Sequence, residues 1–384
     1  LILTKGAIMI EIIEVKTKKE RKEFVEFPNK LYKNNPYFCP AITADELSMF
    51  DPKKNVSYED CEAKYFLAKE NGKVVGRIAG IIQKLYNNKT GEKRVRFSRF
   101  DCINDEKVAK ALFNAVENYA REKGMNLVHG PLGFNDLDRE AMLIEGFDKL
   151  STFEEQYNYP YYPELMEKCG YEKEVDYVEY KLYKPEKYNE RVNRIADAVM
   201  KKYNLRYGTA KNMTEYINKY KDGIFAVVDE VYAPLYGTIP FTDKLRNQII
   251  SQFRLFLNQK LFMTIVDEND KVVAFGCAIP SITKVIQKTK GKIIHPAILK
   301  IFKAIKKPEG VDLALTGVLP EYRAKGVNAL IMKFFIDSMI ELDIKWCETN
   351  LNLEYNSRIQ NQWKNFKHER HKRRRCYIKN LNNN

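Results

Sequence analysis

The sequence predicts a mixed α/β (α+β) protein whose two halves repeat one order of elements. Of the 384 residues, 45% are hydrophobic and 12% are aromatic, which is enough for packed cores. The length fits domains of roughly 150 residues each. Stretches with strand-like spacing alternate with amphipathic helical stretches along the whole chain. A strand, a turn and a second strand are expected once in each half, at 65–83 and at 262–280.

The hairpin at 65–83 is the clearest local signal in the first half. Asn71-Gly72 lies between two apolar runs, and both central residues of such a turn need positive φ. The other expected elements of this half are strands at 9–15, 94–103, 127–128 and 175–182, helices at 18–33, 106–123 and 162–169, and a glycine- and acid-rich segment at 130–150.

The second half is expected to repeat this order. Lys271-Val272-Val273 stands in its hairpin where Lys73-Val74-Val75 stands in the first. An internal duplication explains the match, and chance similarity of two hairpins is the alternative. Lys184-Pro185 is the expected linker, which gives domains at 1–185 and 186–384. The other expected elements are strands at 205–209, 312–319, 344–349 and 375–378, helices at 243–258, 296–307, 327–342 and 356–367, and an aromatic, proline-broken loop at 232–241.

The charge and cysteine content limit the class of protein. Lys and Arg exceed Asp and Glu by 65 to 51, so an anionic partner is expected, although the nucleotide composition of the gene explains the basicity equally well. Seven dispersed cysteines without a C-x-x-C pair predict free thiols in a reducing cytoplasm. The apolar runs are shorter than a membrane-spanning helix. Residues 1–9 are too short for a signal peptide, and Met9 is the expected natural start.

Residues 313–330, LALTGVLPEYRAKGVNAL, carry the most informative motif. An apolar strand leads to Pro320, and residues 323–326 open a helix. Such a turn offers unpaired backbone N–H groups and the positive end of a helix dipole to a phosphate, and Arg323 and Lys325 add positive charge. Many α/β proteins have a similar turn without a ligand, so the turn alone does not establish a site.

The run 318–327 resembles the acyl-coenzyme A signature of the GNAT N-acyltransferase superfamily. Its Arg323 and Gly326 match the pattern of Arg or Gln, two variable residues and Gly, while Asn328 departs from the final Gly or Ala. The resemblance covers 205–378, and the first half resembles a degenerate copy in which acids replace the glycine at 100–106. The whole chain also resembles tandem GNAT proteins of the group similar to bacterial ceramide synthases.

This resemblance implies two tandem GNAT-like domains, each with a mixed, mostly antiparallel sheet flanked by helices. It also implies transfer of an acyl group from acetyl-CoA or another acyl-CoA to an amine, with one coenzyme site, in the second half. The coenzyme-binding residues that it implies are Thr316, Gly317, Val318, Arg323, Ala324, Lys325, Gly326, Val327, Asn328, Asn350 and Asn356.

The catalytic acid and base are less specified. Glu348 is the first candidate base, and Asp136, Asp138 and Glu145 are further candidates, although a solvated surface role suits each of these acids as well. The family tyrosine that donates a proton falls at Trp363, whose indole cannot serve. Tyr355 is a candidate substitute, with an ordinary exposed tyrosine as the alternative reading.

Two basic segments leave the partner open. The helix at 296–307 combines apolar residues with lysines, which suits an anionic lipid surface or a helix packed on the sheet. The tail at 368–376, HERHKRRRC, suits nucleic acid less well than a basic rim or a strand end, and its histidines and cysteine do not form a metal site. The acceptor is expected to be a small-molecule or lipid amine. The rival hypothesis is a non-catalytic GNAT-shaped module that binds nucleic acid or a membrane surface.

Overall fold

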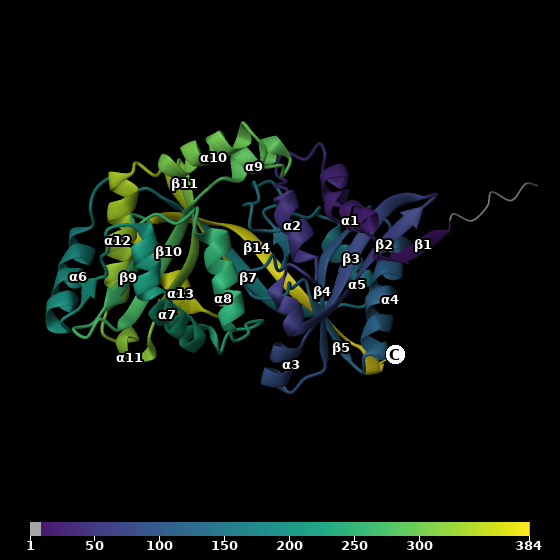
Figure 1. Ribbon diagram of the computed structural model, residues 1–384, viewed down its shortest axis with the longest axis horizontal. Helices are drawn as coiled ribbons and strands as arrows, with labels where there is room; N and C mark the ends of the chain where they lie inside the picture. The colour runs from purple at the N-terminus through teal and green to yellow at the C-terminus, as the bar shows by residue number, and fades with distance from the viewer. Residues whose placement is uncertain (1–8, 384) are drawn as a thin grey trace, which may run out of the picture. The chain divides into compact units, whose positions relative to one another are not determined.

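The computed structural model describes residues 9–383 (Figure 1). The expectation for the segment before Met9 lies outside these residues. The described residues form two compact units: unit 1 comprises residues 9–177, 283–294 and 372–383, and unit 2 comprises Val178–Ile282 and His295–His371.

Unit 1 is built on a sheet in the strand order β1-β2-β3-β4-β5-β14. Its neighbouring strands are antiparallel except for the parallel pair β4–β5. The strands are β1 (Ile10–Glu14), β2 (Cys61–Glu70), β3 (Lys73–Gln83), β4 (Arg94–Cys102), β5 (Leu127–Gly130), β6 (Met142–Glu145), which also pairs with β14, and β14 (Lys367–Asn380) from Lys372 onward. The helices are α1 (Lys18–Leu31), α2 (Thr43–Met49), η1 (Val56–Glu59), α3 (Lys84–Thr90), α4 (Glu106–Glu122), α5 (Tyr162–Lys168), α9 (Thr283–Thr289) and η3 (Leu381–Asn383).

The predicted hairpin is confirmed as β2 and β3. Asn71 and Gly72 have φ values of 49° and 75°, as this turn requires. Helix α4 packs on the sheet at Gly76, where an added Cβ would lie 2.7 Å from Leu112 Cδ1. The absence of a side chain at Gly76 therefore lets α4 approach the sheet and close the core of unit 1.

The strands of unit 2 lie side by side in the order β7-β12-β11-β10-β9-β8. Neighbouring strands are antiparallel except for the parallel pair β11–β12. The strands are β7 (Glu172–Tyr183) from Val178 onward, β8 (Arg206–Tyr207), β9 (Phe262–Val266), β10 (Val272–Pro280), β11 (Gly310–Val318), β12 (Trp346–Thr349) and β13 (Asn352–Leu353). The helices are α6 (Glu190–Lys202), α7 (Met213–Tyr232), α8 (Asp243–Phe253), α10 (Ala297–Lys306), α11 (Pro320–Arg323), α12 (Asn328–Glu341), α13 (Ser357–Gln362) and η2 (Trp363–Asn365).

Helices cover both faces of the unit 2 sheet. An added Cβ at Gly276 in β10 would lie 3.0 Å from Phe335 of α12, and one at Gly317 in β11 would lie 3.1 Å from Val227 of α7. Successive residues of a strand point to opposite faces, and Phe275, next to Gly276, lies beside Gly317. Helix α12 therefore packs on one face, and α7 packs on the other.

The two units repeat one order of elements, which confirms the predicted fold class. A hairpin, a strand, a long helix and a parallel strand follow one another as β2, β3, β4, α4 and β5, and again as β9, β10, β11, α12 and β12. The strands of each unit are mixed and mostly antiparallel, with one parallel pair in each unit.

The last strand of each half is exchanged between the units. Residues 181–183 of β7 pair with β12 in unit 2, and residues 377–380 of β14 pair with β5 in unit 1. The compact units therefore do not coincide with the predicted halves 1–185 and 186–384. The sequence predicts a closing strand at 375–378, but its partner lies more than 200 residues away in the chain.

The expectations for the cysteines and for membrane-spanning helices can be compared with the structure. All seven cysteines are buried and lie outside any disulfide, as their spacing predicts. Across residues 9–383, every helix is too short or too polar to cross a bilayer.

Buried ion pairs hold α2 and the 130–150 segment against β4 in unit 1. Arg99 Nη2 donates a hydrogen bond to Glu46 Oε1 at 2.9 Å and also pairs with Asp138. Arg99 and Glu46 are 1% and 5% exposed. Burial alone would raise the pKa of Glu46, but the charge and hydrogen bonds of Arg99, with help from Arg139, lower this pKa to about 2.

We predict that Glu46 makes unit 1 acid-sensitive. Because its pKa is lower in the folded than in the unfolded chain, its stabilisation is present above pH 4.5 and is lost as the pH falls toward 2. The shift corresponds to about 3 kcal/mol. Hydrogen exchange of β4 amides should show this loss in the parent, whereas Glu46→Gln should be less stable at neutral pH and should lack the loss.

The tryptophans supply an internal control for this measurement. Trp346 and Trp363, the only two in the chain, both belong to unit 2. Their fluorescence should report equal unfolding of unit 2 in the parent and in Glu46→Gln. Equal pH dependence of β4 exchange in both proteins would contradict the assignment.

Candidate functional site

The candidate site begins where β11 and β12 of unit 2 stop pairing. These parallel strands pair from Gly310–Trp346 to Leu313–Thr349. Strand β10 continues to pair with the other edge of β11 as far as Val318. Across the described residues, β11 therefore has one edge without a strand partner from Ala314 to Val318.

A β-bulge marks the start of this open edge. Cys277 of β10 pairs with Leu315 and Ala278 pairs with Leu313, so that Ala314 is the extra residue of β11. A bulge bends its strand and increases the local twist, and bulges are frequent next to active sites. The bulge therefore turns β11 at the residue where β12 ends.

Side chains bind most backbone groups along the open edge. Asn350 Nδ2 donates to the Ala314 carbonyl at 3.3 Å, and Arg323 Nε donates to the Val318 carbonyl at 3.1 Å. The Tyr232 hydroxyl donates to the Thr316 carbonyl at 2.9 Å and accepts from the Thr316 N–H at 3.3 Å. A ligand that paired with β11 here would replace side-chain contacts and would not have to break a strand ladder.

The turn after β11 leads into α12 through the predicted phosphate motif. Gly326 has φ +78°, and α12 begins two residues later without a side-chain cap. Within residues 9–383, the N–H groups of Gly326, Val327 and Asn328 have no hydrogen-bond acceptor. Together with the helix dipole, these amides form a place for an anion.

The equivalent turn of unit 1 is closed to an anion. Asp105 caps α4, and its carboxylate accepts hydrogen bonds from the N–H groups of Lys107 and Val108 at 2.7 Å and 3.4 Å. A carboxylate already occupies the positive end of this helix, and it would repel a phosphate.

Packing restricts the turn in unit 2. An added Cβ at Gly326 would lie 3.2 Å from Val199 Cγ2 of α6. The ammonium of Lys325 lies 4.2 Å from the ring centre of Tyr322 and 5.2 Å from that of Tyr203. Two aromatic rings therefore hold a positive charge beside the open amides.

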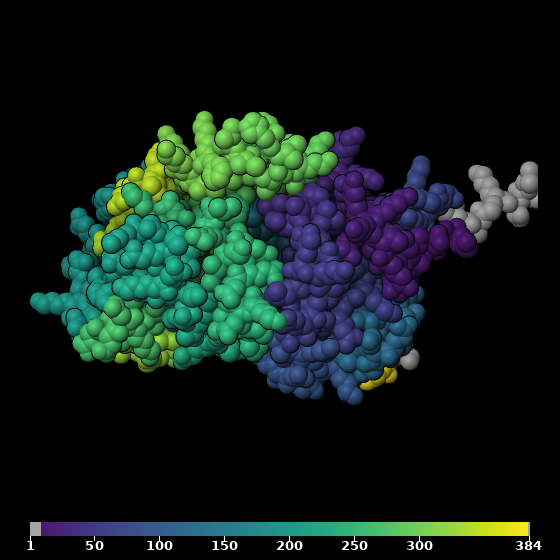
Figure 2. All heavy atoms as spheres, viewed as in Figure 1, coloured from purple at the N-terminus to yellow at the C-terminus, as the bar shows by residue number. Residues whose placement is uncertain are grey.

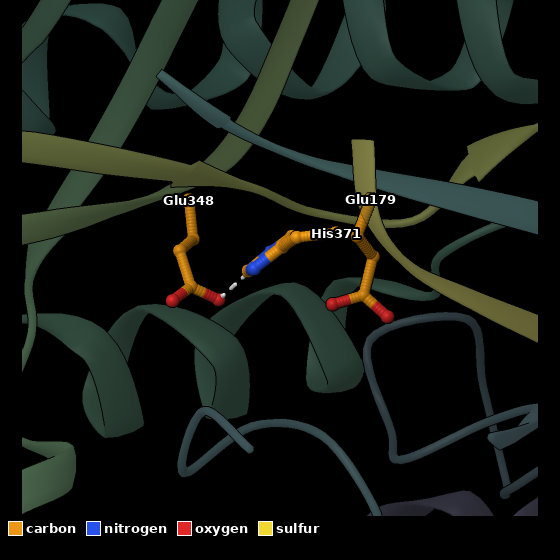
Figure 3. Close-up of side chains that lie close together, drawn as sticks. All are labelled: Glu179, Glu348 and His371. Carbon is orange, nitrogen blue, oxygen red and sulfur yellow. Dashed lines mark ion pairs between the residues drawn. The ribbon is translucent and has the colours of Figure 1, made fainter. Parts of the chain in front are cut away.

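A buried group of titratable side chains lies close to the end of the β11–β12 pairing. It consists of Glu179 on β7, Glu348 on β12 and His371 on β14, whose donor atoms all lie within 4.8 Å of one another. His371 Nε2 is 3.5 Å from Glu348 Oε2. Figure 3 shows the imidazole directed at the Glu348 carboxylate, with Glu179 nearby. We call these residues the Glu–Glu–His group; it could move a proton or hold a small cation.

The Glu–Glu–His group faces away from α12. Cys347 and Leu182 pack in the core with Met332 of α12, so Glu348, adjacent to Cys347, points to the opposite face of the sheet. Glu348 immediately precedes Thr349, the last residue of β12 to pair with β11. The group therefore lies one residue before the strands separate, on the face that α7 covers.

Other residues named from the sequence have structural or exposed positions. Asn356 caps α13 and accepts a hydrogen bond from the Ile359 N–H at 3.4 Å. Trp363 is 4% exposed, and its indole donates to Asn352 Oδ1 at 3.3 Å. Tyr355 is 63% exposed, and partial burial of its hydroxyl raises its pKa.

The candidate acids of the 130–150 segment belong to unit 1, whereas the turn and the Glu–Glu–His group belong to unit 2. Asp138 pairs with Arg99, and Glu145 is exposed at the end of β6. The basic tail is likewise part of a strand. Arg373 and Arg375 both bind Asp176.

Sequence reasoning missed Tyr232, His371 and Glu179 as site residues. Tyr232 is the last residue of α7 and lies 84 positions before the Thr316 backbone that it binds. His371 lies in the basic run of β14, so nothing in the local sequence distinguishes it from the neighbouring basic residues. In both cases the sheet, and no local motif, creates the contact.

Comparison with solved structures identifies the fold of the chain. No protein-family model matches the chain. A tandem GNAT protein from the clavulanic acid biosynthesis pathway aligns over 97% of this chain and 99% of its own, with a TM-score of 0.57 and 12% identity. The chain has a tandem GNAT fold. The open edge of β11 and the turn before α12 lie in the second of its two GNAT-like units.

Two curated proteins resemble this chain along nearly its whole length. Protein YghO of Escherichia coli is 24% identical over 377 residues, which cover 95% of this chain and 94% of that protein. A bacterial ceramide synthase of Caulobacter vibrioides is 25% identical over 389 residues, which cover 97% and 98%.

Proposed function

We propose that this tandem GNAT chain transfers an acyl group from acyl-coenzyme A to an amine, and that unit 2 holds the coenzyme. The observation that carries the proposal is the open edge of β11 beside the uncapped start of α12. The amides of Gly326, Val327 and Asn328 suit a diphosphate, and the unpaired strand edge suits the amide-bearing arm of the coenzyme. Both features lie on one strand and its following turn.

The backbone of β11 supplies the binding groups for the thioester arm. Thr316 presents both its N–H and its C=O to the open edge, where the Tyr232 hydroxyl binds them. The arm would replace this hydroxyl and pair with the strand. The N–H groups of Thr316 to Val318 are the predicted donors for the thioester oxygen, which becomes negative as the amine attacks.

Two proton transfers complete the reaction. The neutral amine attacks the thioester carbon, the new C–N bond forms, and the C–S bond breaks. We assign the uptake of the amine proton to Glu348, directly or through water in the Glu–Glu–His group. We assign the donation of a proton to the leaving thiolate to Tyr232, because its hydroxyl already lies at the open edge.

The acceptor is proposed to be a lipid amine. The similarity to a bacterial ceramide synthase over 97% of the chain supports a long-chain amino alcohol as the acceptor and a long acyl chain as the donated group. Acetyl-CoA with a small amine is the second combination to test, because the fold comparison fits a GNAT acetyltransferase as well.

We predict that acyl-CoA raises the melting temperature of unit 2. A ligand that binds only the folded state at 100 times its Kd stabilises that state by about 2.7 kcal/mol. Acetyl-CoA and palmitoyl-CoA should each be tested by tryptophan fluorescence, with release of free thiol measured in the presence of sphinganine or ethanolamine. An intact protein that shows neither a shift nor thiol release would favour the non-catalytic binding module.

We predict that Gly326→Asp weakens coenzyme A binding far more than Gly326→Asn. Asp and Asn have similar shape, and both tolerate positive φ, so both variants should lose similar stability. Only Asp places an anion among the open amides. Repulsion of about 1.4 kcal/mol would weaken binding about tenfold in calorimetry. Equal affinity in the two variants would remove the turn from the site.

We predict that Tyr232→Phe lowers kcat about 100-fold or more, the range of a lost general acid. Acyl-CoA should bind at least as tightly, because the hydroxyl no longer competes for the Thr316 backbone. The matched variant Tyr355→Phe changes an exposed tyrosine and should keep kcat within about twofold. The opposite ranking of the two variants would return the acid role to Tyr355.

A further inference from the structure

Helix α10 of unit 2 exposes an apolar surface. Ile298, Leu299 and Phe302 are 40%, 59% and 52% exposed, and they are among the most exposed large apolar side chains of the described residues. Single exposed apolar residues are ordinary, but three on one short helix form a patch. In Figure 2, the light green side chains around α10 project from the surface.

A different side of α10 holds it on the protein. Ala297 and Ile301 are 5% and 7% exposed, and they repeat at the helical spacing of four residues. The sequence left two interpretations of this segment, a helix packed on the protein and a helix on a lipid surface. The structure is compatible with both at once: Ala297 and Ile301 pack inward, and the larger apolar side chains stay exposed.

Lysines border the exposed apolar side chains. Lys300, Lys303, Lys306 and Lys307 are all exposed. At 100° per residue, Lys303 and Lys300 lie on the side of the exposed face beyond Leu299, and Lys306 lies between Phe302 and Leu299. Lys307 is the C-cap residue, just beyond the helix. The sequence from Ser281 to Pro308 contains eight lysines and no acidic residue. An exposed apolar face with lysines within it and along one side suits a helix that lies in the interface of an anionic bilayer.

We propose that α10 docks the protein on membranes that contain anionic lipids. Ile298, Leu299 and Phe302 would enter the boundary between headgroups and acyl chains, while the lysines contact anionic headgroups. A second copy of the chain fits this surface poorly, since the lysines of two facing α10 helices would repel each other. Nucleic acid would use the lysines and leave the apolar side chains in water. The proposal does not depend on acyl transfer.

The test is sedimentation of the full chain with vesicles at about 0.1 M salt. At this ionic strength the Debye length is about 10 Å, so lysines close to the lipid surface still interact with it. Phosphatidylcholine vesicles are compared with vesicles in which phosphatidylglycerol replaces a third of the lipid. Binding should be at least about tenfold tighter to the anionic vesicles, and raising the salt should weaken it. Equal binding to both vesicle types would overturn the proposal.

Two double variants separate the apolar and charged contributions. Leu299→Gln with Phe302→Gln should weaken binding at least about tenfold. Lys300→Gln with Lys303→Gln should weaken it about fivefold for each lysine.

The matched controls change similar side chains elsewhere in unit 2. Leu255 is 68% exposed, and Leu255→Gln should leave binding within about twofold. Lys201→Gln with Lys364→Gln removes two exposed lysines outside α10 and should weaken binding less than the α10 lysine pair. Tryptophan fluorescence checks that every variant is folded.

Two results would overturn the assignment to α10. One is equal vesicle binding by the α10 variants and their controls. The other is a dimer in sedimentation velocity that the Leu299 and Phe302 variant abolishes, because that result would assign the apolar patch to a second copy of the chain.

Discussion

The candidate site of unit 2 depends on one feature of the sheet: β11 continues beyond the point where its hydrogen bonding to β12 ends. Pairing ends at Leu313–Thr349, and the bulge at Ala314 bends β11 at the same point. Backbone groups that lose a strand partner need other partners, and Asn350, Tyr232 and Arg323 supply them. These contacts come from side chains and are therefore exchangeable. The helices on both faces fix the sheet, so that the edge stays open while the rest of β11 is held rigidly.

The two units share one order of elements but differ in the polar contacts at the corresponding bulge and turn. In unit 1, β4 has a bulge at the corresponding place, with Arg99 at φ +50°. There, the polar side chains bind one another: Arg99 binds Glu46 and Asp138, and Arg77 binds Asp101. The start of α4 is also filled, by Asp105. In unit 1, these polar side chains form internal ion pairs. In unit 2, the amides at the turn before α12 have no side-chain cap.

The sequence predicts local features of this fold better than its long-range pairings. The Asn71-Gly72 hairpin and the glycine turn at Gly326 both follow from backbone geometry that few residues adopt. By contrast, alternation in a strand says which face is buried but does not name the neighbouring strand. The exchange of β7 and β14, the approach of His371 to Glu348, and the contact of Tyr232 with Thr316 therefore stay invisible until the sheet is known.

The exchange of end strands has a consequence for the order in which the protein can be made. Unit 1 contains the first 177 residues, yet β5 lacks its outer neighbour until residues 377–380 arrive. During translation, the β5 edge has no β14 neighbour until nearly the whole polypeptide has emerged from the ribosome. Such an edge is a template for wrong partners. Expression of residues 1–185 alone would leave the β5 edge without its β14 partner, and expression of residues 186–384 alone would leave β12 without β7.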